Sequence, residues 1–221
     1  REGVNVLLGP GLNIKRSPLC GRNFEYFSED PVLAGKMAAA YIRGIQSQGV
    51  AACPKHFAVN SQEYKRMASD SVIDERTLRE LYLRGFEIAV KEGHPKSIMS
   101  SYNMINGTYA NENRHLLIDI LRNEWGFDGF VVSDWGGSNN RTEGTRAGAN
   151  LEMPAAGADS ALGLIDDVKA GIIDESVLDD RLRELLPVIM EAAGKDNAVK
   201  KEYDVQVNHR IAKKAAAEGI V

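Results

Sequence analysis

Cysteine is scarce in this chain, and its scarcity narrows the possible folds. Cys20 and Cys53 are the only cysteines among 221 residues, and they lie far apart in the sequence. Two such residues do not make the framework of bridges that holds small secreted domains together. No Cys-x-x-Cys pair or Cys/His cluster is present, so the sequence predicts no metal site. We interpret both as ordinary buried thiols, compatible with a reducing compartment such as the cytoplasm.

Basic blocks and long apolar runs are also missing. The 27 Lys and Arg residues are scattered among 31 Asp and Glu residues, giving a formal net charge of −4. A mildly acidic chain has no electrostatic attraction for nucleic acid or for an anionic membrane. No apolar run reaches the ~18 residues that a membrane span needs. We therefore predict neither a nucleic acid nor a membrane as a partner.

Motifs for nucleotide binding and serine chemistry are incomplete. Gly9-Pro10-Gly11 is followed neither by the rest of a GxGxxG pattern nor by a GK[ST] ending, so we predict no nucleotide cofactor. Ser100 and Ser101 do not lie in a GxSxG elbow. The chemistry of this chain must therefore come from other residues.

Short apolar runs alternate with amphipathic stretches along the chain. The runs are bounded by Gly, Asn or Pro, as buried parallel strands are. The expected strands are residues 4–8, 50–57, 97–101, 130–133 and 150–153, and the expected helices are residues 30–48, 74–92, 111–125, 160–170, 175–193 and 208–218. This alternation predicts a parallel α/β fold.

Two parallel architectures fit this pattern, an open doubly wound sheet and a closed barrel. A complete (β/α)8 barrel needs eight strands and about 250 residues, so about five β/α units would be an incomplete barrel. The polar residues 194–207 are typical of a linker. Residues 219–221 resemble the beginning of a further strand.

Functional side chains of parallel α/β folds lie at the carboxyl ends of the strands. The side chains that this rule selects are Arg16, Arg22, Lys55, His56, Ser101, Tyr102, Asn103, Asp134, Trp135 and Glu152. Aromatic faces pack on pyranose rings, and cationic and amide groups bind hydroxyls. A carboxylate on a rigid strand end can attack an anomeric carbon. The set therefore favours carbohydrate chemistry.

Each of these residues also has a structural alternative. Asp134 would cap the helix that follows it, and Trp135 would belong to the core. Arg22 would pair only with Glu25, and residues 55–56 would be a surface pair. The sequence alone leaves these alternatives open.

Five long blocks bear a specific resemblance. They are residues 9–31 (GPGLNIKRSPLCGRNFEYFSEDP), 54–63 (PKHFAVNSQE), 98–113 (IMSSYNMINGTYANEN), 126–137 (GFDGFVVSDWGG) and 147–154 (AGANLEMP). In this order they resemble consecutive blocks of glycoside hydrolase family 3. The resemblance implies a TIM-like (β/α)8 barrel, incomplete in this chain over residues 1–193. It also implies a linker over residues 194–207 and the start of an α/β sandwich domain over residues 208–221.

The family resemblance implies a retaining β-glucosidase that hydrolyses terminal non-reducing β-D-glucosyl residues without a metal or cofactor. Asp134 matches the nucleophile. The residues that match sugar contacts are Arg22, Lys55, His56, Met99, Tyr102 and Trp135. The acid/base carboxylate is expected outside this chain, in the sandwich domain, and Glu63 and Glu152 are interpreted as structural. Block 54–63 resembles the β-glucosidase and β-xylosidase branch rather than the KHFPGHG loop of the N-acetylglucosaminidases.

The expected partners follow from this assignment. They are a β-glucoside or oligosaccharide substrate, and complementing segments of the same protein or a second copy in a homo-oligomer, because an incomplete barrel exposes unpaired strand edges. The alternatives are a non-catalytic sugar-binding barrel fragment, β-xylosidase specificity and an unrelated doubly wound ligand-binding protein. The sequence leaves the compartment open.

Overall fold

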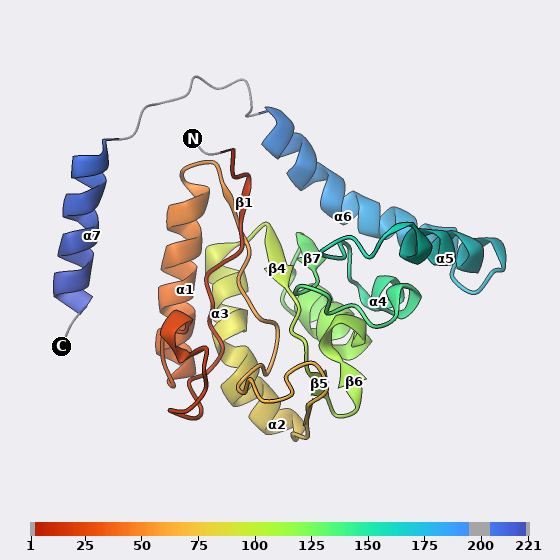
Figure 1. The fold of residues 1–221 in the computed structure, drawn as a ribbon, viewed down its shortest axis with the longest axis horizontal. Helices are drawn as coiled ribbons and strands as arrows, with labels where there is room; N and C mark the ends of the chain where they lie inside the picture. Colours follow the sequence, from red (N-terminus) through yellow and green to blue (C-terminus); the bar gives the residue numbers. More distant parts are fainter. Residues whose placement is uncertain (1–2, 195–203, 220–221) are drawn as a thin grey trace.

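A computed structural model describes residues 3–194 and 204–219, and its centre is a row of parallel strands (Figure 1). The strands of this row are β1 (Val6–Leu7), β2 (Ala51–Ala52), β4 (Ser97–Met99) and β7 (Phe130–Val132). β1 pairs with β2 and β4 pairs with β7, both in parallel. Further parallel bridges are Gly11 with Lys55, Phe57 with Ser100, and Val132 with Leu151. Four of the five predicted strands are thereby confirmed, although they are shorter than predicted, and the fifth, residues 150–153, forms only the single bridge at Leu151.

The strands stand side by side in the order in which they occur in the sequence. A doubly wound sheet reverses its strand order at a switch point, whereas the wall of a (β/α) barrel keeps it. Within the described residues, the row has two open ends, one at β1 and one at Leu151. The chain thus forms an α/β wall that is open in this structure.

Helices follow the strands as predicted, with some differences in their bounds. The α-helices described are α1 (Pro31–Gln46), α2 (Glu75–Thr77), α3 (Arg84–Gly93), α4 (Arg141–Ala147), α5 (Ala158–Lys169), α6 (Glu175–Gly194) and α7 (Val205–Gly219). A π-helical segment, η2 (Leu78–Leu83), joins α2 to α3, so the predicted helix over residues 74–92 is confirmed. The helix α4 was not predicted; Asn140 caps it by accepting a hydrogen bond from the Glu143 amide.

The start of α1 shows how local chemistry fixes a helix end. The Asp30 carboxylate accepts hydrogen bonds from the amides of Val32 and Leu33, at 2.7 and 3.0 Å. Pro31 occupies the first helical position, where its missing N–H is not needed. The predicted start of this helix at residue 30 is therefore confirmed.

The helix predicted over residues 111–125 begins later than expected. It is the π-helical segment η4 (His115–Glu124), preceded by a 3₁₀ turn, η3 (Ala110–Glu112). Asn113, rather than Asn111, caps it by accepting a hydrogen bond from the Leu116 amide at 3.0 Å. Asn111 is buried and accepts a hydrogen bond from the Ser100 hydroxyl at 2.8 Å instead. Two asparagines so close together give the sequence no means of choosing the cap.

A small second sheet was not predicted. It contains β3 (Asp70–Ser71), β5 (Met104–Ile105) and β6 (Thr108–Tyr109), with β5 and β6 forming a hairpin. The hairpin turns at Asn106-Gly107, both at positive φ, which is the dipeptide that two-residue hairpin turns prefer. That dipeptide was the signal that the sequence analysis missed.

The row of strands separates two apolar clusters. On one face, the side chains of α1, α3 and η4 bury Ile98 and Val131. On the other face, Cys53, Met99 and Val132 pack together, and Val188 of α6 covers them. Alternate residues of a strand point to opposite faces, so this second face continues along β7 to Asp134. The predicted burial of Cys53 is confirmed, whereas Cys20 is only partly buried.

The predicted division between residues 193 and 208 is described only in part. The helix α6 extends to Gly194, α7 begins at Val205, and residues 195–203 of the predicted linker and residues 220–221 of the predicted strand lie outside the described residues. The described residues of α7 are exposed. No helix among the described residues is long and apolar enough to cross a membrane.

Two glycines allow α1 and α3 to pack closely. A Cβ added at Gly35 would lie 2.8 Å from Ile88 Cβ and 2.9 Å from the Gly85 carbonyl oxygen. We expect Gly35→Ala to lower the free energy of unfolding by about 1–3 kcal/mol, because the helices must move apart. Urea unfolding of the purified chain measures this change.

The same helix supplies the matched control. Gly44 is exposed, and a Cβ added there would meet nothing within 4 Å. Gly44→Ala is expected to raise stability by up to about 1 kcal/mol through helix propensity. Equal effects of the two substitutions would contradict the close packing at Gly35.

Candidate active site

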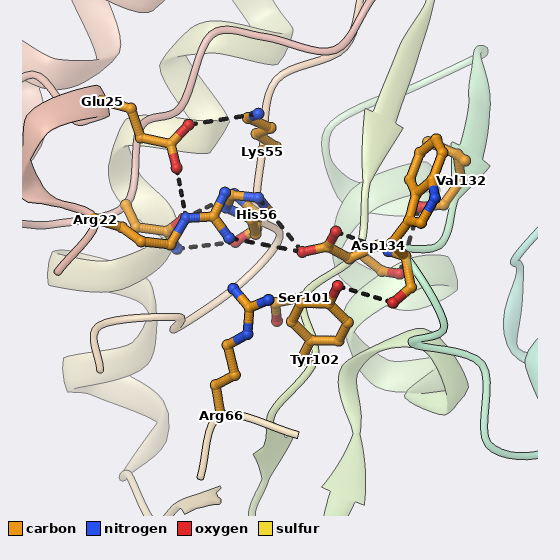
Figure 2. A network of polar contacts seen from close by, with 12 residues as sticks. Arg22, Glu25, Lys55, His56, Arg66, Ser101, Tyr102, Val132 and Asp134 are labelled. Atoms are coloured by element: carbon orange, nitrogen blue, oxygen red, sulfur yellow. Dashed lines mark hydrogen bonds and ion pairs between the residues drawn. The ribbon is translucent and has the colours of Figure 1, made fainter. Parts of the chain in front are cut away.

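Asp134 lies where the second face of the row reaches the carboxyl end of β7 (Figure 2). The residue is only 7% exposed. Its Oδ1 accepts a hydrogen bond from the Trp135 amide at 2.7 Å. Its Oδ2 is buried without a hydrogen bond, 3.5 Å from His56 Nε2 and 3.9 Å from Arg22 Nη1. One carboxylate oxygen is thus held by the backbone, and the other faces nitrogen groups at longer range.

A group of alternating charges lies beside Asp134. Glu25 Oε1 accepts a hydrogen bond from Arg22 Nε at 2.5 Å, and Glu25 Oε2 lies 3.4 Å from Lys55 Nζ. The three side chains are each less than one-fifth exposed. Glu25 therefore fixes two cations from different loops on the same side of the Asp134 carboxylate (Figure 2).

His56 is held on three sides. Asn13 clamps its backbone: the Asn13 side-chain amide donates to the His56 carbonyl at 2.8 Å, and the His56 amide donates to Asn13 Oδ1 at 2.7 Å. Its ring lies 3.2 Å from the Tyr26 hydroxyl through Nδ1 and faces Asp134 through Nε2. Burial, reinforced by the charges of Arg22 and Lys55, lowers the pKa of His56 to about 2. The imidazole is therefore neutral.

Tyr102 and Trp135 form the opposite side of the site. The Tyr102 hydroxyl donates a hydrogen bond to the Trp135 carbonyl at 2.8 Å. Burial, together with the nearby Asp134 charge, raises the pKa of Tyr102. The Trp135 residue is 48% exposed, so its indole is available at the surface of the site. Its expected alternative as a core residue is wrong.

Arg66 is a site residue that the sequence analysis missed. Its guanidinium lies 4.6 Å from the centroid of the Tyr102 ring and pairs with Glu63 at 2.9 Å. Figure 2 shows it reaching toward Tyr102 from a separate loop. No spacing in the sequence indicates this contact, because residues 66 and 102 meet only through the packing of neighbouring loops.

Of the seven predicted site residues, six come together and one lies apart. Those that meet are Arg22, Lys55, His56, Tyr102, Asp134 and Trp135. Met99 is 2% exposed and packs with Phe130 and Val132 beneath the site, so its role as a sugar contact stays a prediction.

The remaining structural alternatives can be judged by contact. Residues 55–56 are not a surface pair, because His56 is 1% exposed. The cap of the next helix after Asp134 is Asn140, not Asp134. Arg22 does pair with Glu25 as that alternative expected, and it also approaches Asp134.

A separate cavity of about 740 Å³ lies between the loops that follow β1 and β2. Its lining includes Arg16, Gly21, Glu63, Tyr64 and Asp70 but not Asp134. It is therefore a neighbour of the site described above rather than part of it. No group of three or more potential metal-ligating His, Cys, Asp or Glu side chains occurs in residues 3–194 and 204–219.

Curated proteins similar to this chain include named glycosidases. The chain is 53% identical over 222 aligned residues to the thermostable beta-glucosidase B of Acetivibrio thermocellus, covering 100% of this chain and 29% of that protein. It is 44% identical to an exo-alpha-(1->6)-L-arabinopyranosidase of Bifidobacterium longum, again over 100% of this chain and 29% of the relative. The chain thus spans less than a third of the length of these relatives.

A solved structure agrees with these sequence similarities. Beta-glucosidase 3B from Thermotoga neapolitana, in complex with alpha-D-glucose, superimposes with a TM-score of 0.94 at 47% identity. The superposition covers 98% of this chain and 31% of that chain. Residues 1–188 match the model of the glycosyl hydrolase family 3 N-terminal domain. The chain therefore belongs to glycosyl hydrolase family 3.

Proposed function

We propose that this chain carries the nucleophile half of a retaining β-glycosidase of the β-glucosidase type, with Asp134 as the nucleophile. The observation that carries the proposal is the state of the Asp134 carboxylate. Its Oδ1 is fixed by the Trp135 amide, while its buried Oδ2 has no hydrogen bond and faces His56 and Arg22. An oxygen held in place yet free of a hydrogen bond is available to attack an anomeric carbon.

The surrounding charges suit attack by this carboxylate. Arg22 lies 3.9 Å from Oδ2 and places a positive charge beside the attacking oxygen. Glu25 pairs with Arg22 and Lys55, so the cations are not drawn fully onto Asp134. A carboxylate locked into a close ion pair would be a weaker nucleophile.

The same groups suit the binding of a pyranose ring. Lys55, Arg22 and neutral His56 provide N–H donors for sugar hydroxyls. The exposed indole of Trp135 provides an apolar face for the C–H face of the ring. Arg66, next to Tyr102, adds a further donor to those the sequence predicted. Such hydrogen bonds strengthen as the oxocarbenium-like transition state develops.

The second carboxylate of the mechanism is proposed to lie outside this chain. A retaining glycosidase needs an acid/base group about 5–5.5 Å from the nucleophile. Glu152 is tied to Arg141 at 2.7 Å and to the Ser160 hydroxyl, and Glu63 is tied to Arg66. Both therefore have structural partners. The open ends of the strand row likewise leave room for complementing segments that would complete a (β/α)8 barrel.

The leading substrates are terminal β-D-glucosides. Relatives named beta-glucosidase support this choice. The competing substrates are α-L-arabinopyranosides, from the relative named exo-alpha-(1->6)-L-arabinopyranosidase, and the β-xylosides considered from the sequence. Both competitors lack the C6 hydroxymethyl group of glucose. Comparing kcat/KM for the p-nitrophenyl β-D-glucoside, β-D-xyloside and α-L-arabinopyranoside decides among them, and a larger value for either pentoside would overturn the assignment to glucosides.

Covalent labelling tests the nucleophile. We expect 2-deoxy-2-fluoro-β-glucosyl fluoride to add one sugar to Asp134, because fluoride leaves without an acid catalyst and the 2-fluoro group slows hydrolysis of the intermediate. Intact mass and peptide sequencing locate the adduct. Asp134→Asn should give no adduct, whereas Glu152→Gln, which alters a carboxylate on the neighbouring strand end, should still be labelled.

The outcomes of labelling separate the candidate functions. An adduct on a residue other than Asp134 would refute the assignment. Glucose binding without any adduct, on the longest native polypeptide that carries these residues, would favour the non-catalytic sugar-binding alternative instead.

The neutral state of His56 predicts a pH effect. The unfolded imidazole takes up a proton near pH 6.5, whereas the folded ring resists protonation down to about pH 2. Below pH 6.5 the unfolded chain binds a proton at this residue that the folded chain does not. The free energy of unfolding is therefore highest above pH 6.5 and falls with decreasing pH by up to about 1.4 kcal/mol per pH unit. Between pH 7 and pH 5 the free energy of unfolding, measured with urea, should fall less for His56→Gln than for the unaltered chain. An equal loss in both would contradict a neutral, buried His56.

A further inference from the structure

The neutral ring of His56 has two tautomers, with the hydrogen on Nδ1 or on Nε2, and the contacts around the ring distinguish them. In a neutral imidazole one nitrogen carries the hydrogen and donates, while the other accepts. Nε2 faces Asp134 Oδ2 at 3.5 Å, and Nδ1 faces the Tyr26 hydroxyl at 3.2 Å. Whichever nitrogen donates at one contact, the other must accept at the other contact.

Asp134 constrains the first of these contacts. An ionised carboxylate only accepts hydrogen bonds, so an Nε2 lone pair turned toward it would be repelled. The favourable arrangement places the hydrogen on Nε2. The Nδ1 atom is then an acceptor, and it needs a donor because the ring is 1% exposed to solvent.

Tyr26 is the donor that the fold provides. Its residue is 3% exposed, and burial raises the pKa of its phenol, which keeps the O–H hydrogen in place. Its ring meets the His56 ring edge-on, at 72° between the planes. Gly11 makes room for it: a Cβ there would come within 3.0 Å of the Tyr26 ring.

From these contacts we propose that Tyr26 is a positioning residue for the site. It donates to His56 Nδ1, which fixes the hydrogen of the imidazole on Nε2, the nitrogen that lies 3.5 Å from Asp134 Oδ2 without a hydrogen bond to it. Only the effect of Tyr26 on the reactivity of Asp134 rests on the proposed function. The hydrogen bond from Tyr26 O–H to His56 Nδ1 and the placement of the imidazole hydrogen on Nε2 are properties of the folded chain.

The role of Tyr26 is distinct from that of Glu25, its neighbour in the sequence. Glu25 holds the two cations Arg22 and Lys55, whereas Tyr26 contacts the neutral ring. Glu25 and Tyr26 both lie in the loop after β1. The same loop supplies Asn13, whose side chain makes two hydrogen bonds with the His56 backbone. One loop therefore sets the position of the His56 main chain and the hydrogen on its ring.

Long-range ¹H–¹⁵N NMR of the imidazoles in the unaltered 221-residue chain gives the first test, with His56→Gln used for assignment. We expect hydrogen on Nε2 and a hydrogen-bonded Nδ1. Tyr26→Phe removes only the hydroxyl, and it should shift the His56 Nδ1 resonance toward that of a nitrogen without a hydrogen bond. Tyr82→Phe, the same change at another buried tyrosine, should leave His56 unchanged.

Labelling of Asp134 by the fluorosugar supplies the functional readout. Tyr26→Phe should slow it about five- to tenfold, the effect of losing one hydrogen bond, and Tyr82→Phe should not. Hydrogen on Nδ1 in the unaltered chain, or a His56 signal that Tyr26→Phe does not move, would overturn the proposal whether or not labelling occurs. A labelling rate unchanged by Tyr26→Phe would overturn its consequence for Asp134. Absence of labelling in every variant, with the NMR result as expected, would count against the proposed function and leave the hydrogen-bond assignment standing.

Discussion

Parallel pairing of the strands in sequence order is the constraint on which the rest of this structure depends. It brings the residues that follow β1, β2, β4 and β7 to one edge, although Arg22 and Asp134 lie more than a hundred residues apart in the chain. Asp134 follows β7, Lys55 and His56 follow β2, and Tyr102 follows β4. Without this pairing the contacts between different loops of the site, such as His56 with Asp134, would not form.

Within that edge, the loop after β1 does most of the positioning. Glu25 fixes Arg22 and Lys55, Asn13 clamps the His56 backbone, and Tyr26 contacts the His56 ring. None of these interactions is made directly with the hydrogen-bond-free oxygen of Asp134. The cost of burying several charges is offset because each cation has a carboxylate partner. The arrangement leaves the reactive oxygen unblocked while its surroundings stay rigid.

Much of this could be predicted from the sequence, and the reasons are local. Apolar runs bounded by Gly, Asn or Pro located the strands, and Asp30-Pro31 located the start of α1. The strand-end rule located Asp134 and Lys55. By contrast, the Asn106-Gly107 hairpin and α4 are short elements whose apolar pattern is too brief to register. Capping by Asn113 rather than Asn111 depends on the burial of Asn111 against Ser100.

Contacts between loops were beyond the reach of sequence reasoning. Arg66 reaches Tyr102 and Tyr26 reaches His56 only because loops from different strands pack together. At Met99, a position in a motif predicted a sugar contact, and the structure places the side chain in the apolar cluster beneath the site, so this role stays a prediction. Motifs identify which residues share a site, whereas packing decides how each one faces it.

The most direct measurement of the central claim is rescue by azide of an Asp134→Ala variant, using 2,4-dinitrophenyl β-glucoside, whose leaving group needs no acid. The active site proposed here has Asp134 on the α face of the anomeric carbon. Azide entering the space left by that carboxylate should therefore restore turnover and yield the α-glucosyl azide. Formation of the β-glucosyl azide would place Asp134 in the acid/base role and contradict the account.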